Sequence, residues 1–185
     1  YPGAPLISSL AAFHAGCGLV SLCSEKGVLD KVYNSHPSIM GVGKESVRRV
    51  KNNAFLLGPG WDEGDRELLD YVVESRKPIV IDADAIKLIE RDHDFSSLAV
   101  LTPHLGEFRT LCSNLGIEDG DFYEKSRKAS EMLNAVIVIK TSVVWIFYKE
   151  KAFVYDGSNP SLGVAGSGDV LSGIIGAFLS SGMDV

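Results

Sequence analysis

Apolar residues recur along this chain with two spacings, one typical of strands and one typical of helices. Short apolar runs of strand length fall at residues 19–23, 54–57, 78–82, 99–102, 136–140, 144–148 and 152–155. Between these runs, apolar residues recur at helical spacing in residues 5–15, 63–75, 85–91, 106–112 and 122–133. A last helix is predicted to begin near Gly168, because apolar residues recur at helical spacing from Val170 to Phe178.

The order of these elements predicts the fold class. Strands separated by helices favour right-handed crossovers and a mostly parallel sheet with helices on both faces. The last two apolar runs, on either side of Lys149 and Glu150, indicate a hairpin and therefore an antiparallel edge. The chain contains no internal repeat, low-complexity tract or linker, so the sequence predicts a single α/β domain over residues 1–185.

Composition and charge narrow the function classes. The 185 residues are 45% hydrophobic and 23% charged, which is typical of a globular protein. A net charge of −6 without basic runs argues against a nucleic acid or an anionic membrane as partner. No apolar run is long enough to span a membrane, and no His, Cys and Asp cluster has metal-ligand spacing. Three cysteines without CxxC spacing indicate a reducing compartment, so we expect a cytoplasmic protein.

The ends of the predicted strands carry unusual residues, and parallel sheets bind ligands at the carboxyl ends of their strands. The second run leads into a Gly-Pro-Gly turn at 58–60, whose glycines allow a ligand to approach the backbone. The next two runs lead into Asp82-Ala83-Asp84 and into residues 102–107, and a later run ends on Lys140. Each feature alone has a structural explanation, such as a common turn, a helix cap by Asp84 or a first helical turn at Glu107. Together they predict a ligand site at this edge.

The start of the last helix is the main phosphate candidate. The amides of Gly166, Ser167, Gly168 and Asp169 are expected to be unpaired at a helix N-terminus, where the helix dipole favours anions. Asp169 beside such an anion site is placed to take a proton from a hydroxyl that is being phosphorylated. The alternative is that the glycines of this helix only allow close packing and that Asp169 is a first-turn carboxylate.

The Gly-Ser-Gly-Asp helix start resembles the anion-hole motif of the ribokinase-like superfamily. A set of ordered motifs is similar to the ADP/ATP-dependent NAD(P)H-hydrate dehydratases. In chain order, these motifs are "GPG", "VIDADAI", "LTPHLGEF", "VIK" and "NPSLGVAGSGDVLSGIIGAF". "GAPLISSLAAFHAGCGLVSL" resembles that family's first helix and second strand. The resemblance covers almost the whole chain and implies a ribokinase-like three-layer α/β/α sandwich. It places the family's first strand before Tyr1 and its closing helices after Val185.

The resemblance also implies a repair reaction on hydrated NADH or NADPH. A phosphoryl group from ADP or ATP, with Mg²⁺ bridging the phosphates, turns the C6 hydroxyl into a phosphate, and elimination then restores the ring. By family position, the hydrated cofactor is contacted by Ala4, Gly60, His104 and the catalytic Asp169. The residues implied to hold the nucleotide are Lys140, Thr141, Ser142, Val143, Val144, Gly166, Ser167 and Gly168. Family members tend to form tetramers, so a homo-oligomer is expected.

The chain departs from the family pattern at several positions. The family usually has Pro at the position of Leu105, and Gly, Thr and Gly at the positions of Ser161, Val164 and Ala165. After Lys140 the family prefers a glycine with a Thr further on, where this chain has Thr141 and Val144.

The alternative functions are a small-molecule kinase of the same fold, such as a vitamin-precursor kinase, and a non-catalytic nucleotide-binding module. The combination of "TPHLGE" and "GPG" favours the dehydratase.

Overall fold

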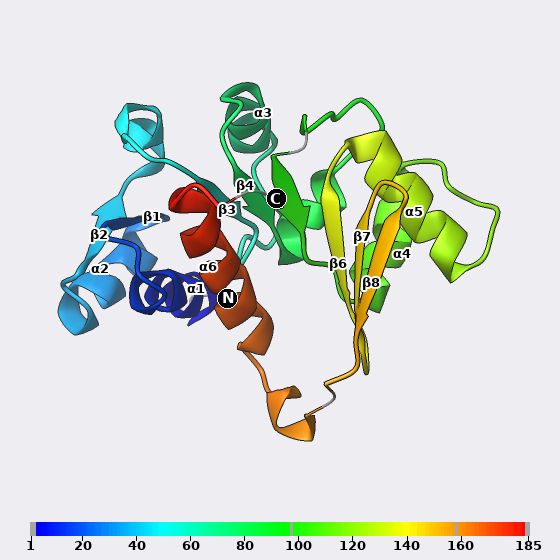
Figure 1. The fold of residues 1–185 in the computed structure, drawn as a ribbon. Coiled ribbons are helices and arrows are strands. Elements are labelled where there is room, and N and C mark those ends of the chain that lie inside the picture. The colour runs from blue at the N-terminus through cyan, green and yellow to red at the C-terminus, as the bar shows by residue number, and fades with distance from the viewer. Residues whose placement is uncertain (1–2, 97, 158, 184–185) are drawn as a thin grey trace.

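The computed structural model describes residues 3–96, 98–157 and 159–183, and its central part is a three-layer α/β/α sandwich (Figure 1). Among these residues, the central sheet has the strand order β3 (Phe55–Leu57), β4 (Ile79–Ile81), β5 (Ala99–Leu101), β6 (Val136–Lys140), β7 (Val144–Tyr148) and β8 (Lys151–Tyr155). The strands from β3 to β6 are parallel, whereas β7 and β8 form an antiparallel hairpin at the edge. The fold class predicted from the sequence is confirmed.

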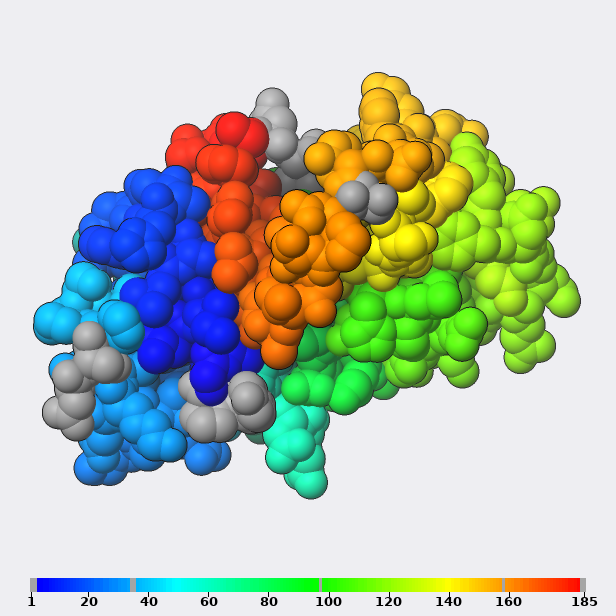
Figure 2. All heavy atoms as spheres, turned by 90° about the horizontal axis from the view of Figure 1, so that it is seen from below, coloured from blue at the N-terminus to red at the C-terminus, as the bar shows by residue number. Residues whose placement is uncertain are grey.

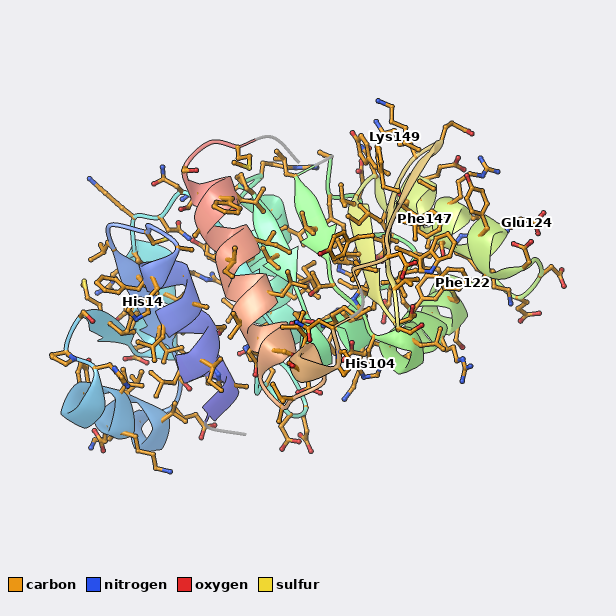
Figure 3. All side chains as sticks on the ribbon, turned by 60° about the horizontal axis from the view of Figure 1, so that its bottom comes forward. His14, His104, Phe122, Glu124, Phe147 and Lys149 are labelled. Carbon is orange, nitrogen blue, oxygen red and sulfur yellow. The ribbon has the colours of Figure 1, made fainter. Side chains whose placement is uncertain are left out.

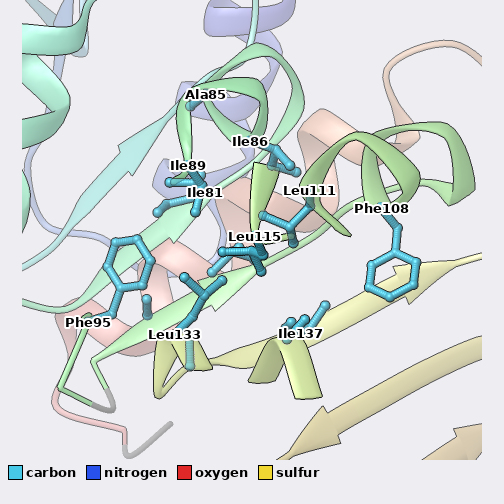
Figure 4. Close-up of a cluster of buried hydrophobic side chains, with 14 of the residues drawn as sticks. Ile81, Ala85, Ile86, Ile89, Phe95, Phe108, Leu111, Leu115, Leu133 and Ile137 are labelled. Atoms are coloured by element: carbon cyan, nitrogen blue, oxygen red, sulfur yellow. The ribbon is translucent and has the colours of Figure 1, made fainter. Parts of the chain in front are cut away.

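The two faces of the sheet are covered by different helices. On one face, α3 (Arg66–Glu74), α4 (Leu105–Asn114) and α5 (Phe122–Leu133) enclose the larger hydrophobic core, part of which Figure 4 shows. On the other face, α6 (Ser167–Ser180) packs on valines of β4, β5 and β6. No helix in the described part of the chain is both long and apolar enough to cross a membrane.

The N-terminal helix α1 (Gly3–His14) lies directly beside α6, as Figures 1 and 2 show from two directions. This approach requires Gly173 of α6, because a Cβ there would lie 2.3 Å from the carbonyl oxygen of Ser8 and 2.8 Å from the Cβ of Ala11. At the carboxyl end of the pair, Cys17 Sγ lies 3.3 Å from Ser180 Oγ. The two helices therefore run in the same direction.

The first predicted strand does not join the central sheet. β1 (Val20–Cys23) pairs in parallel with β2 (Ile39–Val42), and this short sheet packs with α1 and α2 (Lys26–Ser35) around its own core. The side chain of Leu22 lies in that core with residues of α1 and α2, which explains why β1 is apolar without being a central strand. A short 3₁₀ helix, η1 (Lys44–Arg49), follows β2.

The helix predicted at 85–91 is a 3₁₀ helix instead, η2 (Ala83–Leu88). It begins at Ala83, whose φ of +47° is left-handed, and the chain is extended again at Ile89. A third 3₁₀ helix, η3 (Pro160–Leu162), precedes α6. Gly58 has a structural reason as well, because a Cβ there would lie 1.7 Å from the carbonyl oxygen of Asp82. Its packing against the neighbouring strand end already requires a glycine.

Candidate active site

Three polar side chains follow the central strands on the face that α6 covers. The backbone ladder continues past the strands, since the amide of Asp82 donates to Leu57 O at 3.0 Å and that of Thr102 to Ile81 O at 3.0 Å. Alternate residues of a strand share a face. The valines of β4, β5 and β6 pack with α6, so the residues two positions further along also point toward α6. These residues are Asp82, Thr102 and Lys140.

The ammonium of Lys140 lies between a buried carboxylate and the first turn of α6. Its Nζ is 2.9 Å from Asp82 Oδ1, and Asp82 is only 2% exposed. A Cβ placed on Gly168 would be 3.2 Å from the same Nζ. A side chain at position 168 would therefore crowd this ammonium, and the glycine leaves it room beside the start of α6.

The first turn of α6 offers free backbone donors. Gly166 is the N-cap residue with φ +91°, and no side chain caps this helix. Among the described residues, the amides of Gly168 and Asp169 donate no hydrogen bond. The prediction that the Ser167 amide is unpaired was wrong, because this amide donates to Val164 O at 3.3 Å in a tight turn. The free amides, the helix dipole and the Lys140 ammonium together form a site suited to an anion such as phosphate.

Asp169 has the environment expected of a base. Partial burial raises the pKa of its carboxyl above the ordinary value, and the nearby carboxylate of Asp82 raises it further, while Lys140 lowers it. A carboxylate with a raised pKa binds a proton more strongly than an exposed one, and it lies one residue from the free amide of Gly168. The structure therefore brings a proton acceptor to the edge of the anion site.

The predicted nucleotide segment after Lys140 is the tight turn between β6 and β7. The amide of Thr141 donates to Val143 O at 3.1 Å, and its hydroxyl donates to the same oxygen at 2.6 Å. Thr141 and Ser142 are exposed, and Val144 is the first residue of β7. The turn is therefore closed by its own hydrogen bonds, and its exposed residues directly follow Lys140 in the chain.

His104 is the N-cap residue of α4. Its ring Nδ1 accepts hydrogen bonds from the amides of Gly106 at 2.9 Å and Glu107 at 3.2 Å, and the carboxylate of Glu107 accepts from the His104 amide at 2.8 Å. The ring is largely exposed at the edge of the sheet where α6 begins, whereas His14 lies apart on α1 (Figure 3). The backbone of His104 pairs with that of Lys140, and the Lys140 amide donates to Pro103 O at 2.9 Å. The structure thus places the predicted substrate residue beside a predicted nucleotide residue.

The structure places the remaining two predicted substrate residues differently. Ala4 is buried in the first turn of α1, three residues before Ile7, whose Cδ1 would lie 3.1 Å from a Cβ on Gly166. Gly60, with φ +73°, lines a cavity of about 460 Å³ between the edge strands β1 and β3. That cavity is lined neither by Lys140 nor by Asp169, so it is not the anion site.

Two residues of this site were not assigned by the sequence reasoning. Asp82 was noted as a strand end without a role, and the buried hydroxyl of Thr102, which has no hydrogen-bond partner among the described residues, was not singled out. The strand period of two was the available signal, because it places both on the same face as Lys140. No group of three or more His, Cys, Asp or Glu side chains in the described ranges could hold a metal ion.

The sheet is mostly parallel with an antiparallel edge, and α6 has an uncapped, glycine-rich start. Both features agree with the ribokinase-like class of α/β proteins that the sequence resembles. The sequence matches the NAD(P)H-hydrate dehydratase family over residues 1–185, and the chain belongs to this family. It is 32% identical to the ADP-dependent (S)-NAD(P)H-hydrate dehydratase of Neisseria meningitidis, over 99% of this chain and 67% of that protein.

Two solved structures show the same fold. A ribokinase-like superfamily protein of Enterococcus faecalis V583 superposes with a TM-score of 0.80 at 26% identity, covering 96% of this chain and 66% of that one. The ADP/ATP-dependent NAD(P)H-hydrate dehydratase of Bacillus subtilis, co-crystallised with ATP/Mg²⁺, gives a TM-score of 0.78 at 22% identity, covering 97% and 68%. The chain thus spans about two thirds of the length of these relatives.

Proposed function

We propose that this chain carries the catalytic site for nucleotide-dependent dehydration of hydrated NADH or NADPH, in which the C6 hydroxyl is phosphorylated and phosphate is then eliminated. One observation carries the proposal. The Lys140 ammonium lies close to the free amides of Gly168 and Asp169, and the Asp169 carboxylate at the same helix start has a raised pKa. Family membership supports the choice of substrate.

In the proposed reaction, Asp169 takes the proton of the C6 hydroxyl while that oxygen attacks the terminal phosphorus of the nucleotide. The bond from this phosphorus to the leaving nucleotide breaks, giving AMP from ADP or ADP from ATP. Lys140 and the amides at the start of α6 bind the transferred group and offset the charge that develops on it. The new phosphate then leaves C6 as the neighbouring ring carbon loses a proton, which restores the double bond.

The nucleotide and its Mg²⁺ are part of the proposal. The Neisseria relative is named ADP-dependent, and the Bacillus structure was obtained with ATP/Mg²⁺. In such sites Mg²⁺ keeps several waters and binds substrate phosphates. The Lys140 ammonium and the free amides at the start of α6 suit those phosphates, so the residues present fit a nucleotide that carries Mg²⁺. When bound, Mg²⁺ would neutralise phosphate charge.

The substrate side and the assembly are proposed by the family resemblance. Ala4, Gly60 and His104 would contact the hydrated cofactor, and residues 141–144 with Gly166 and Ser167 would contact the nucleotide. A homo-oligomer is supported by the exposed edge strand β8, where Phe153 and Tyr155 are 58% and 65% exposed. A cytoplasmic location is supported by three cysteines that are all free.

The decisive assay incubates the full-length protein with hydrated NADH, Mg²⁺ and either ADP or ATP. We expect the absorbance of reduced nicotinamide to return only when a nucleotide is present. Parallel reactions with vitamin-precursor alcohols test the kinase alternative. If hydrated cofactor stays unchanged while such an alcohol is phosphorylated, the protein is a small-molecule kinase and the dehydratase proposal is wrong.

A further inference from the structure

Asp82 is a buried carboxylate that the proposed reaction leaves without a specific role. We propose that Asp82 is a positioning residue, which holds the ammonium of Lys140 against the first turn of α6 where the transferred phosphoryl group would bind. The chemistry of this inference rests on the proposed function, whereas its geometry rests on the contacts of Asp82 and Lys140.

Within this ion pair, Asp82 is the fixed partner and Lys140 the positioned one. A buried carboxylate needs a partner, and Asp82 has Lys140 Nζ at 2.9 Å. The backbone of Asp82 is tied to Leu57 O by its amide, and Ala83 turns the chain immediately after it. Lys140 instead carries its charge on a flexible four-carbon stem. The pair crosses from β4 to β6, over the intervening end of β5.

Anchoring would prepare Lys140 to bind phosphate. An ammonium has three N–H donors, so the bond to Asp82 leaves two for phosphate oxygens. The side chain of Lys140 is 24% exposed, so an unanchored lysine could turn toward water. An unanchored lysine would lose rotamer freedom when it binds a phosphate, whereas the anchored side chain has already lost that freedom in the folded protein. Asp82 therefore acts on the nucleotide through Lys140.

Asp82 also affects the charge of Asp169. The charged groups that shift the pKa of Asp169 are Asp82 and Lys140. His14 lies in the last turn of α1, away from the first turn of α6. His104 and Glu107 pair with each other at the start of α4. After burial, the Asp82 carboxylate is the next cause that raises the pKa of Asp169, against the opposing effect of Lys140.

Two substitutions separate positioning from charge. Asp82→Asn removes the charge but keeps an oxygen that accepts from Lys140, whereas Asp82→Ala removes both. We expect the Kd for ADP, measured by titration calorimetry, to be about tenfold higher in Asp82→Ala than in Asp82→Asn, within the range of couplings between contacting residues. In a Lys140→Ala background this difference should vanish, because Asp82 then has no ammonium to position.

The pH dependence tests the charge effect. Removing the Asp82 carboxylate takes away one cause of the raised pKa of Asp169, so the acid limb of kcat should move to lower pH in Asp82→Asn. The matched control is Asp84→Asn, two residues away, where the carboxylate is paired with the exposed Lys87 and accepts from the Asp62 amide. This control should keep the wild-type acid limb and ADP affinity.

Several results would overturn the inference. Equal ADP affinities in folded Asp82→Ala and Asp82→Asn proteins would remove the positioning role, and so would a difference that persists without Lys140. If Asp82→Ala does not fold, Asp82→Val takes its place in the comparison, because valine also offers Lys140 no acceptor. ADP affinity does not require turnover, so a protein that binds ADP but ignores hydrated NADH refutes the proposed function alone. A wild-type protein that binds neither ADP nor ATP refutes both.

Discussion

Two helices begin at the same edge of the sheet, and they begin in opposite ways. α4 starts with a complete capping box, in which the His104 ring accepts two amides and the Glu107 carboxylate accepts a third. α6 starts at Gly166 without a side-chain cap, and the amides of Gly168 and Asp169 have no acceptor in the described part of the chain. The backbone pairing of His104 with Lys140 brings the two starts close together.

The difference separates a helix start that its own side chains cap from one that leaves backbone donors free. A side-chain cap contributes about 1 kcal/mol, and α6 forgoes it. α6 also keeps the Asp169 carboxylate near that of Asp82, an arrangement that raises its pKa. Departures from local stability rules concentrate at functional sites. The start of α6, rather than that of α4, is therefore where substitutions should affect chemistry more than folding.

The largest effect is expected from Asp169→Asn. The substitution keeps the size of the side chain and removes the proton acceptor, so kcat should fall by about 10²–10⁴-fold, the usual contribution of a general base. ADP affinity should remain, because the amides and Lys140 are unchanged. Steady-state kinetics and calorimetric titration of the same preparation measure both. A wild-type kcat in this variant would show that Asp169 is only a first-turn carboxylate.

Gly168→Val should impair the same helix start through binding. The new Cβ would lie 3.2 Å from Lys140 Nζ and would displace the ammonium or crowd the phosphate. Loss of one charge-assisted hydrogen bond corresponds to roughly 10- to 100-fold in the Kd for ADP. Gly176→Ala is the matched control, because a Cβ there meets only Val80 and Leu56 at 3.9 and 4.0 Å. Unchanged ADP affinity in Gly168→Val would place the nucleotide elsewhere.

Much of this comparison could be predicted from the sequence. The helix at 122–133 and the strands at 136–140 and 144–148 were predicted with the observed bounds, because their apolar spacing is regular and they are bounded by turns. The start of α6 was predicted to within one residue from its glycines and Asp169. These are local signals, and no distant contact was needed to detect them.

The rest depended on contacts between distant segments. α2 and β2 were missed because they are short and few of their side chains are buried. Among the described side chains, these are Leu29 and Val32 of α2 and Ile39 of β2. The partner of Lys140 is 58 residues away in the chain, so no motif links it to Asp82. The capping role of His104 depends on the orientation of its ring, which the sequence does not specify.

His104 should show an intermediate effect, divided between stability and binding. His104→Ala removes the N-cap of α4 and should lower the free energy of unfolding by about 1 kcal/mol. His104→Asn restores a side chain that caps helices well, so most of that stability should return. If His104 contacts the hydrated cofactor, both variants raise the KM for hydrated NADH more than that for nucleotide. A KM that recovers in His104→Asn would mean that the ring serves α4 alone.

The smallest effect concerns the stability of Asp169→Asn. The folded protein raises the pKa of this carboxyl above its unfolded value, so its contribution to stability is fully present at low pH and is lost as pH rises through the raised pKa. At neutral pH the charged form is held beside Asp82 in a partly buried position, and Asn removes that charge. The variant should therefore melt slightly above the wild type at neutral pH, and this advantage should shrink as pH falls.

Glu107→Gln at the start of α4 provides the contrast. The Glu107 carboxylate accepts a hydrogen bond from the His104 amide, so its replacement should not raise the melting temperature. If Asp169→Asn instead melts below the wild type at neutral pH, the Asp169 charge stabilises α6, and the two helix starts are alike in stability.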